Sequence, residues 1–328
     1  MATYFLTGAT GFIGSRLARQ LVEAGHTVRA LVRDPWRAEA LQALGAELSR
    51  GDVTEKDSMR APMRGVDGVF HVAGWWHLGA RDTSAAQRVN VDGTRNVLEL
   101  VRELAIPKAV YTSTAAVFGD TRGQVVDETF RQGGPWLSEY DRTKWVAHYE
   151  VAEPMMREGL PLVIVQPSAV YGAGDPSPLG QTIRQYLRRR LLAMPSDGGA
   201  GWAHVEDTAR GHVLAMEKGR PGESYVISGE LHSYLEAFQV AQRITGIPPA
   251  WLVVPPAPVR ALAKVVSYAE RVVPVPTTYS SEYLRVVAGS TYYASNAKAR
   301  IELGFEPRTL EEGFREVLAA ERASLGLS

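Results

Sequence analysis

Tyr140 and Lys144 are the two side chains whose types and spacing best suit acid–base chemistry. Four residues apart on a helix, a phenol and an ammonium lie on the same face. A free tyrosine has a pKa of about 10, which makes it a poor acid–base group at neutral pH, and a neighbouring cation lowers that pKa by favouring the phenolate. Such a pair also arises by chance on helix surfaces, so it is informative only together with other parts of a site.

A hydroxyl group at the end of a neighbouring strand would complete such a site by holding the oxygen of a substrate carbonyl. The stretch 111–119, Tyr-Thr-Ser-Thr-Ala-Ala-Val-Phe-Gly, supplies Ser113 and Thr114 where a predicted strand ends. Together with the Tyr–Lys pair, it predicts proton transfer to or from a carbonyl or hydroxyl group.

A glycine-rich turn near the start of the chain predicts a dinucleotide site. The turn follows the first predicted strand and opens the first predicted helix, the context in which glycines allow close approach of the backbone to a pyrophosphate. The helix N-terminus also offers unpaired N–H groups to phosphates. An ordinary glycine-rich turn is the alternative. The residues expected at the cofactor are Gly8, Thr10, Gly11, Phe12, Ile13 and Gly14.

The end of the second predicted strand bears on the choice between NADP and NAD. NAD-binding folds place an acid there to bind the ribose hydroxyls, whereas this chain has Val32 followed by Arg33. A guanidinium binds a 2′-phosphate through charge-assisted hydrogen bonds. We therefore predict NADP, with NAD as the alternative in which Asp34 serves the ribose and Arg33 is solvated. Asp52 and Val53, after the third strand, are expected to flank the adenine.

These residues require a scaffold, and short apolar strands alternating with helical patterns predict an α/β fold with a Rossmann-type, doubly wound parallel sheet. The predicted strands are 4–7, 27–32, 46–49, 68–71, 109–113, 162–166 and 223–228. The predicted helices are 13–24, 36–44, 90–105 and 140–158. Pro154 should end or kink the last of these helices.

The same pattern divides the chain into two parts. Residues 1–166 and about 205–228 are assigned to a dinucleotide-binding domain, and residues 167–204 and 229–328 to a smaller, discontinuous α/β substrate region. Ligands of open α/β sheets bind beyond the carboxyl ends of the strands. The substrate cleft is therefore expected between the two parts.

Composition excludes several classes of function. The chain has 36 basic and 36 acidic residues, so neither a nucleic-acid partner nor a membrane partner is expected. Without cysteine there are no disulfides or thiolate sites, and His71, His77, His204 and His212 lack the spacing of a ligand cluster, so no metal site is predicted. The N-terminal apolar run is too short for a signal peptide or a spanning helix, which predicts a cytoplasmic protein.

A series of motifs runs along nearly the whole chain. They are TGATGFIG (7–14), TVRALVRDP (27–35), GDVT (51–54), HVAG (71–74), VNVDGT (89–94), YTSTAAVFG (111–119), the Tyr140/Lys144 pair, QPSAVYGAGD (166–175), HVEDTARGH (204–212) and NAKARIELGFEPRTLEEGF (296–314). In this order they resemble an extended short-chain dehydrogenase/reductase. The resemblance is greatest to the branch of dihydroflavonol reductases and related bacterial epimerase-like oxidoreductases.

The resemblance implies a role for individual residues. It aligns Thr114 with the family's catalytic Ser/Thr, with Ser113 as the second choice. It implies that Tyr140 is the acid–base catalyst and that Lys144 binds the nicotinamide ribose. It places Asn90 near the cofactor, where Asn90 holds the active-site helix and strand together. Further residues expected at the cofactor are Ala73 and Gly74 near the ribose, and Pro167 and Ser168 against the nicotinamide. The segment 27–35 also resembles that of NADP-using reductases.

Two departures from the family argue against nucleotide-sugar chemistry. Ala115 and Ala116 stand where the 4,6-dehydratases carry an Asp-Glu pair that protonates the leaving hydroxyl. Residues 200–203, Ala-Gly-Trp-Ala, lack the arginine that clamps the diphosphate in nucleotide-sugar enzymes, although Arg184 or Arg285 could substitute. Relatives also dimerise through helices equivalent to 90–105 and 140–158, which implies a homodimer.

Aromatic side chains fall where this fold places the mouth of the cleft. They favour an apolar or aromatic substrate, and packing within the core is the alternative for each of them. They are Trp75, Trp76, Trp136, Tyr171 and Trp202.

Three functions follow from these observations. The leading one is an NADP-dependent oxidoreductase that transfers hydride between nicotinamide and a ketone or aldehyde, or the corresponding alcohol. The second is an NAD(P)-dependent epimerase of a sugar or nucleotide-sugar, in which the cofactor is reduced and reoxidised within one turnover. The third is a non-catalytic NADP sensor, which would not need Thr114, Tyr140 and Lys144 together.

Overall fold

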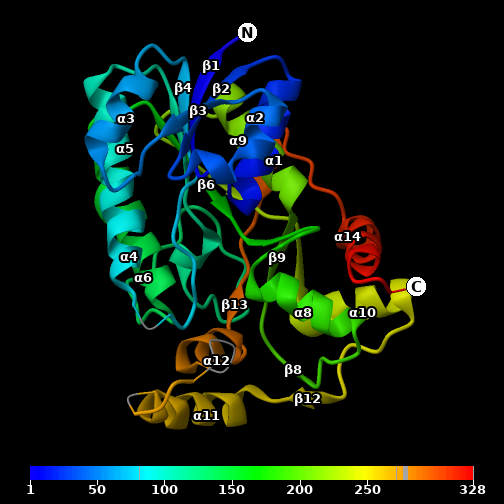
Figure 1. The fold of residues 1–328 in the computed structure, drawn as a ribbon. Helices are drawn as coiled ribbons and strands as arrows, with labels where there is room; N and C mark the ends of the chain where they lie inside the picture. The colour runs from blue at the N-terminus through cyan, green and yellow to red at the C-terminus, as the bar shows by residue number, and fades with distance from the viewer. Residues whose placement is uncertain (81, 271, 276–279, 328) are drawn as a thin grey trace.

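A seven-stranded parallel sheet forms the centre of the molecule (Figure 1). The structure is a computed structural model and describes residues 1–80, 82–270, 272–275 and 280–327. The strands are β1 (Thr3–Thr7), β2 (Thr27–Val32), β3 (Glu47–Arg50), β4 (Gly68–His71), β5 (Ala109–Thr112), β6 (Leu162–Pro167) and β10 (Ser224–Ile227). Their spatial order is β10-β6-β5-β4-β1-β2-β3, and each neighbouring pair is parallel. The predicted Rossmann-type fold is confirmed, and every predicted strand agrees with the observed one to within one residue at each end.

Helices cover both faces of this sheet, because each parallel strand returns through a crossover on one side or the other. α1 (Phe12–Glu23) and α9 (Val205–Lys218) cover one face, where Leu17 and Leu214 enter its buried core. α3 (Lys56–Met63) and α5 (Gly93–Glu103) cover the other. The sequence did not predict α3, because Pro62 and a run of charged residues obscure its apolar pattern.

π-helical turns divide both long helices of the second face. The first runs through α4 (Ser84–Ala86) and η2 (Gln87–Asp92) into α5, and the second through α6 (Glu139–Val146) and η4 (Ala147–Ala152) into α7 (Glu153–Arg157). The predicted helix end at Pro154 was wrong, because the helix continues to Arg157. Pro154 lies in the first turn of α7, after the π-turn has shifted the hydrogen-bond ladder, so its missing N–H costs little.

The predicted helix 36–44 is also in two pieces. A 3₁₀ turn, η1 (Pro35–Arg37), is followed by α2 (Glu39–Leu44). The side chain of Asp34 caps η1 by accepting a hydrogen bond from the backbone N–H of Trp36 at 3.1 Å. This capping bond fixes the direction of the Asp34 carboxylate.

Smaller sheets and further helices form the rest of the molecule. β9 (Gly199–His204) pairs with β7 (Ala169–Tyr171), β11 (Glu230–Ser233) and β13 (Thr291–Tyr292), and β8 (Ala193–Pro195) pairs with β12 (Leu252–Val254). The helices are α8 (Pro178–Leu187), α10 (Tyr234–Thr245), α11 (Pro256–Ala269), α12 (Ser281–Val287), α13 (Ala297–Leu303) and α14 (Leu310–Ser324). β9, α8, α10 and α14 share a buried core, whereas α13 packs on α9 and β10.

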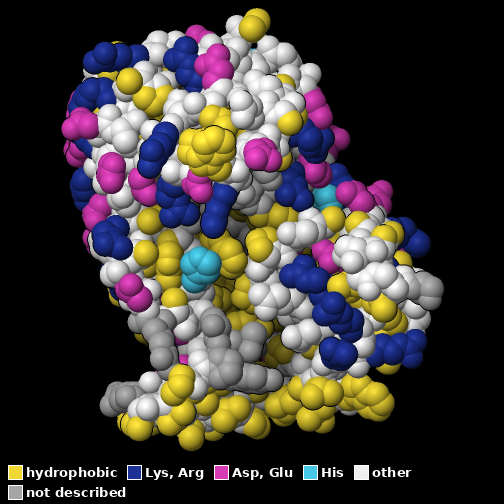
Figure 2. Space-filling model, viewed as in Figure 1, with side chains coloured by type: hydrophobic (Ala, Val, Ile, Leu, Met, Phe, Trp, Pro, Cys, Tyr) yellow, Lys and Arg dark blue, Asp and Glu magenta, His cyan; other side chains and the backbone are white. Residues whose placement is uncertain are grey.

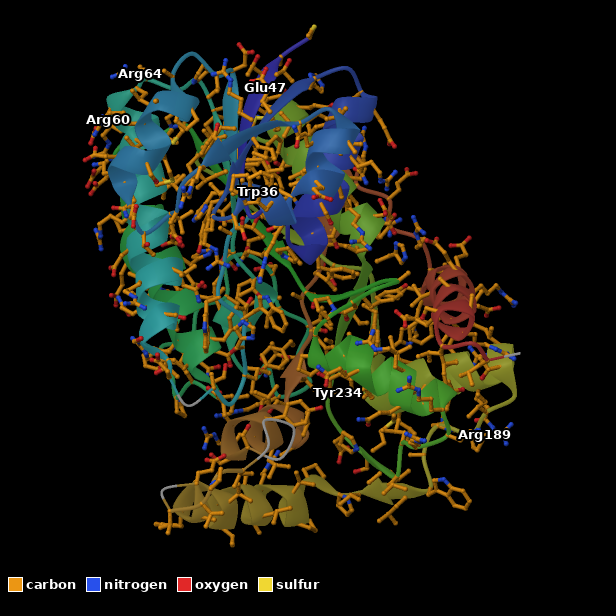
Figure 3. The ribbon with its side chains drawn as sticks, viewed as in Figure 1. Trp36, Glu47, Arg60, Arg64, Arg189 and Tyr234 are labelled. Atoms are coloured by element: carbon orange, nitrogen blue, oxygen red, sulfur yellow. The ribbon has the colours of Figure 1, made fainter. Side chains whose placement is uncertain are left out.

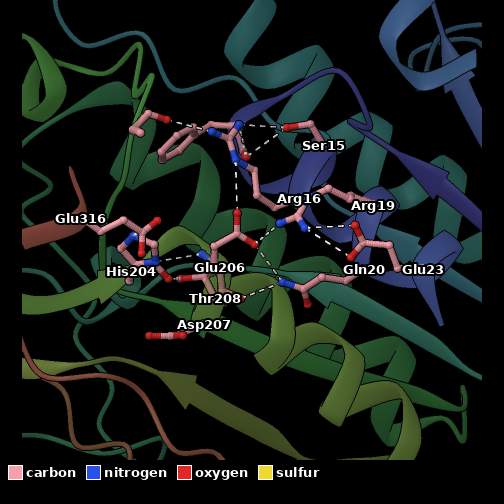
Figure 4. A network of polar contacts seen from close by, with 12 residues as sticks. Ser15, Arg16, Arg19, Gln20, Glu23, His204, Glu206, Asp207, Thr208 and Glu316 are labelled. Carbon is pink, nitrogen blue, oxygen red and sulfur yellow. Dashed lines mark hydrogen bonds and ion pairs between the residues drawn. The ribbon is translucent and has the colours of Figure 1, made fainter. Parts of the chain in front are cut away.

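Polar contacts fix α1 to the start of α9 and to the segment after β7 (Figure 4). Arg19 Nη2 donates to Glu206 Oε2 at 2.6 Å, and Gln20 Nε2 donates to the Glu206 carbonyl at 3.0 Å. Arg16 Nη2 donates to the Ala173 carbonyl at 2.8 Å. This network sets the position of α1, and therefore of the glycine turn that precedes it.

Candidate active site

A cavity of about 1190 Å³ lies beyond the carboxyl ends of β1, β2, β4, β5 and β6. It extends from the glycine turn to α8, α10 and α12, so its two ends are built from different parts of the chain. Figure 2 shows a hollow at the centre of the molecule, with hydrophobic side chains inside it. This is the edge of the sheet at which ligands of open α/β folds bind.

The glycine turn forms a cradle that no side chain could share. Gly8 has a φ of +74°, and a Cβ added to it would lie 2.6 Å from the backbone nitrogen of Ala73. A Cβ on Gly14 would lie 2.1 Å from the Gly8 carbonyl oxygen. All of the residues predicted at this turn line the cavity, and the last three of them form the first turn of α1. Bare backbone next to a helix N-terminus fits the phosphates of a dinucleotide.

Directly after the carboxyl end of β2, Arg33 lines the cavity, whereas Asp34 does not. The Asp34 carboxylate is held by its capping bond to Trp36 and lies 3.6 Å from Arg37. Among the residues that the structure describes, no carboxylate pairs with Arg33. Asp52 and Val53, predicted to flank the adenine, also line this end.

Thr114 and Tyr140 lie close together on the cavity wall, where the Thr114 hydroxyl favours the ionised form of the Tyr140 phenol. Thr114 follows β5 and accepts a hydrogen bond from the backbone N–H of Ala116 at 3.2 Å, which fixes its rotamer. Ser113, the second choice for the catalytic hydroxyl, is instead bonded to His148 Nδ1 at 2.8 Å. The structure thus brings Thr114, and not the Ser113 hydroxyl, to Tyr140.

Lys144 lies in the same wall, nearly buried. Its Nζ donates to the Thr112 carbonyl at 2.7 Å and to the Tyr111 hydroxyl at 3.1 Å. Burial lowers its pKa to about 7. Burial also raises the pKa of Tyr140 to about 12, against the sequence-based expectation that Lys144 would lower it. Removal of solvent from the phenol is the largest influence on its pKa, and the Thr114 hydroxyl lowers this pKa only in part.

Asn90 joins the loop after β4 to the active-site helix. Its Oδ1 accepts from the Trp75 N–H at 2.7 Å, and its Nδ2 donates to the Trp75 carbonyl and to Thr143 Oγ1, both at 2.9 Å. Thr143 lies one residue before Lys144 on α6. Asn90 therefore occupies the bridging position that was predicted, close to the loop in which Ala73 and Gly74 line the cavity.

The predicted aromatic residues separate into two groups. Trp75 and Trp76 line the cavity. Trp136, Tyr171 and Trp202 lie outside its described lining, and that part of the prediction was wrong. Tyr171 and Trp202 are buried with Phe314, at ring distances of 5.3 and 5.6 Å, and Trp136 packs on Trp145 at 5.6 Å. The apolar surface of Tyr171 and Trp202 stabilises the core instead, whereas Trp136 is 38% exposed.

Aromatic and aliphatic residues that the sequence did not single out line the substrate end of the cavity. They are Tyr234 and Phe238 from α10, Tyr283, Val286 and Val287 from α12, and Tyr292 from β13. No motif marks them, because they come together only through the packing of separate segments. Of the candidate arginines, Arg184 pairs with Glu321 at 3.5 Å and Arg285 donates to the Leu137 carbonyl at 3.3 Å. Neither belongs to the described lining, whereas Arg190 does.

Asp141 and Tyr292 are two further cavity residues that the sequence did not single out. Both line the cavity, and neither Asp141 Oδ2 nor the Tyr292 hydroxyl has a hydrogen-bond partner among the described residues. Burial, and to a smaller extent the carboxylate of Glu282, raises the pKa of Asp141 to about 7. Next to Tyr140, these atoms can bind a polar group of a substrate. The only sequence signal is the position of Asp141 beside the catalytic tyrosine.

Replacing Asp141 with Asn is expected to raise the free energy of unfolding above about pH 7 by roughly 2–4 kcal/mol. The folded-state pKa of Asp141 lies above its ordinary value of 3.8, so the wild type loses stability as the pH rises from 3.8 to about 7, and the variant does not. Urea unfolding at pH values below and above this window measures the difference. Asp57→Asn, at a side chain 91% exposed, should change stability by less than about 0.5 kcal/mol. A gain from Asp141→Asn that is equal at both ends of the window contradicts the assignment.

Comparison with known proteins agrees with this geometry. Residues 4–228 match the model of the NAD dependent epimerase/dehydratase family. A protein of Synechocystis sp. with the provisional name dihydroflavonol 4-reductase is 36% identical over 263 residues, 76% of each chain. Sterol demethylase protein B of Methylococcus capsulatus is 30% identical over 97% of each chain.

Solved structures show the same fold. The crystal structure of gox2253 has a TM-score of 0.84 and 31% identity, with all of both chains covered. A UDP-glucuronic acid 4-epimerase of Bacillus cereus, solved with UDP-glucuronic acid and NAD, has a TM-score of 0.77 and 22% identity over 98% of this chain and 99% of that one. The chain therefore belongs to the NAD dependent epimerase/dehydratase family, and is a nicotinamide-dependent enzyme of the extended short-chain dehydrogenase/reductase type.

Proposed function

We propose that the protein is an NADP-dependent reductase of ketones or aldehydes with an apolar or aromatic body. The observation that carries this proposal is that Thr114 and Tyr140 lie together on the cavity wall, between a glycine cradle on one side and an apolar wall on the other. When bound, the reduced nicotinamide supplies a hydride to the carbonyl carbon. The protein's own part is to hold the carbonyl oxygen and to supply a proton to it.

Residues of the chain suit each part of the cofactor. The cradle of Gly8, Gly11 and Gly14 would hold the diphosphate, and Arg33 the 2′-phosphate. Asp52 and Val53 would flank the adenine. The remaining contacts would come from Ala73, Gly74 and Lys144 to the nicotinamide ribose, and from Pro167 and Ser168 to the nicotinamide.

Tyr140 is suited to protonating the carbonyl oxygen. A phenol whose pKa is raised to about 12 is fully protonated at neutral pH, and it holds its proton until charge develops on the substrate oxygen. The Thr114 hydroxyl would donate a hydrogen bond to the same oxygen. Donors fixed in place before the reaction stabilise the developing alkoxide without reorganisation.

The lining of the cavity supports an apolar substrate. Tyr283, Val286 and Val287 face the end beyond Tyr140, and Ala115 and Ala116 supply no carboxylate for a dehydration. Arg190 also lines the cavity and could bind a diphosphate, so an epimerase of a nucleotide-sugar is the second candidate. The two differ in their use of the cofactor: a reductase exchanges it in each turnover, and an epimerase retains it.

The proposal is tested by titrating the protein with NADPH and NADH and then screening carbonyl compounds by the near-ultraviolet absorbance of reduced nicotinamide. We expect tighter binding of NADPH and net oxidation with aromatic or apolar carbonyls. A cofactor that stays bound through purification and is never consumed would favour the epimerase. Exchangeable binding without turnover across the panel would favour the sensor.

Arg33→Ala is expected to weaken NADPH binding about 10- to 100-fold, and NADH binding less than about two-fold, because charge-assisted hydrogen bonds to the 2′-phosphate are lost. Fluorescence titration with both cofactors measures this. Arg37→Ala is the matched control: Arg37 is 87% exposed, pairs with Asp34 at 3.6 Å and lies outside the described lining. Unchanged NADPH affinity in Arg33→Ala would indicate NAD as the cofactor.

A further inference from the structure

An exposed band of hydrophobic side chains covers β12 and α11, at the end of the molecule farthest from β1 (Figures 1 and 2). The apolar strip is the name used below for five of its exposed members, which are Trp251, Leu252, Val253, Leu262 and Val265. Trp251 is 83% exposed and Val265 is 65% exposed. Exposed apolar patches on soluble proteins usually mark an interaction surface.

The orientation of α11 is the reverse of that expected for a helix packed on a core. Along it, Leu262 and Val265 lie at helical spacing and both point outward, whereas of its described residues only Ala263 is buried. A helix that turns its apolar face to solvent requires an apolar partner. Burial against the residues that the structure describes does not explain the strip.

We infer that the apolar strip docks on the surface of an anionic lipid bilayer. Cations border it: Arg188, Arg189 and Arg190 follow α8 and are exposed, and Arg260 and Lys264 lie on α11 itself. Figure 3 shows Arg189 above the end of β12. Aromatic and aliphatic side chains beside lysine and arginine are the composition of helices that lie in the interface of anionic membranes.

The acidic residues Glu270 and Asp197 lie near the strip, but they are fewer than the five cations that border it. Glu270 accepts hydrogen bonds from the backbone N–H and the hydroxyl of Ser281, both at 2.7 Å, and so faces α12. Asp197 accepts from Ser196 Oγ at 2.8 Å. The zero net charge of the whole chain therefore conceals a local excess of cations, which is why composition predicted no membrane partner. Of the helices in the described residues, none has the length and apolar character to cross a bilayer, so docking would be peripheral.

The strip is continuous with the wall of the cavity. β12 pairs with β8, whose residues Ala193, Met194 and Pro195 line the cavity, and the Leu252 N–H donates to the Leu192 carbonyl at 3.0 Å. Leu192 is itself 71% exposed and also lines the cavity. An apolar compound dissolved in the bilayer would thus meet an apolar path to the site. By contrast, the homodimer predicted from the resemblance would use α5 and α6, which lie on another side of the molecule (Figure 1).

This inference does not depend on the reaction, and its test needs no substrate. The purified full-length protein is centrifuged with vesicles of phosphatidylcholine alone, or of phosphatidylcholine mixed with phosphatidylglycerol. We expect co-sedimentation with the anionic vesicles, weakened by salt, and little with the neutral ones. The Leu262→Glu/Val265→Glu variant should lose it, and Arg188→Gln/Arg189→Gln should weaken it about five-fold for each cation removed. Ile301→Glu, at an 84% exposed position on α13, should bind as the wild type does.

Two further measurements keep the result unambiguous. NADPH titration of each variant reports whether it is folded, since none of the changed residues lines the cavity. Sedimentation velocity without lipid reports whether a second copy of the chain covers the strip. Failure of the wild type to bind anionic vesicles, equal binding by the Leu262→Glu/Val265→Glu variant, or a dimer that this variant dissociates would each overturn the inference.

Discussion

Tyr140→Phe is expected to lower kcat for carbonyl reduction by about 10³-fold while leaving the affinity for NADPH within about two-fold of wild type. The change removes one hydroxyl from the cavity wall and leaves the ring. The substrate oxygen thereby loses its proton donor, whereas the Thr114 hydroxyl, held by the Ala116 N–H, stays in place. Steady-state kinetics with the best carbonyl from the screen, together with a cofactor titration, measures both quantities.

Tyr149→Phe is the matched control for this experiment. Tyr149 lies on the same long helix, and its hydroxyl donates to the Phe130 carbonyl at 3.3 Å, away from the cavity lining. It should keep kcat within about two-fold of wild type, because only a structural hydrogen bond of modest value is removed. Turnover by Tyr140→Phe at a level close to that of Tyr149→Phe would rule out the phenol as the proton donor.

The pH dependence of the same reaction gives an independent check on the role of Tyr140. With its pKa raised to about 12, the phenol carries its proton throughout the neutral range, so the reduction rate should not fall through deprotonation of Tyr140 at mildly alkaline pH. Oxidation of an alcohol needs the phenolate and should rise with pH. This difference in direction follows from burial of the phenol.

The parts of the site that sequence predicted are those governed by local geometry. Gly8, Gly11 and Gly14 are dictated by backbone contacts within one strand–turn–helix unit, and the spacing of Tyr140 and Lys144 by one helix. The strands of the central sheet are buried apolar runs between turns, which is why their limits agree so closely. Each of these features can be recognised within about twenty residues of chain.

The parts that sequence missed depend on how distant segments pack. Tyr171 is the last residue of β7 and Trp202 lies within β9, and both side chains point into the core shared with Phe314. Tyr292 reaches the cavity from β13, and its sequence neighbours give no sign of this. Pro154 was misread because a π-turn, set by the tertiary fit of the long helix, precedes it. The cations beside the apolar strip were likewise missed, because the net charge of the whole chain is zero.

Gly8→Ala is expected to destabilise the folded protein by about 3–5 kcal/mol and to abolish measurable NADPH binding in the fraction that remains folded. Two costs combine at this residue. The backbone has a φ of +74°, which an alanine adopts only with strain, and the new Cβ would lie 2.6 Å from the Ala73 nitrogen and 2.8 Å from the Val72 carbonyl carbon. Both neighbours are backbone atoms of the segment that directly follows β4, and this segment is tied to the end of β1 by the hydrogen bond from the Val72 N–H to the Thr7 carbonyl at 3.3 Å.

Gly25→Ala separates the two costs. Gly25 has a φ of +81°, close to that of Gly8, but a Cβ there would meet nothing within 4 Å. It should therefore show the strain alone, about 1 kcal/mol, with NADPH affinity unchanged. Urea unfolding and cofactor titration of both variants give the difference that is due to crowding at Gly8. If the two variants were equally stable, the contact between the turn and the end of β4 would be looser than the structure shows, and the cradle would not be the reason for glycine at this position.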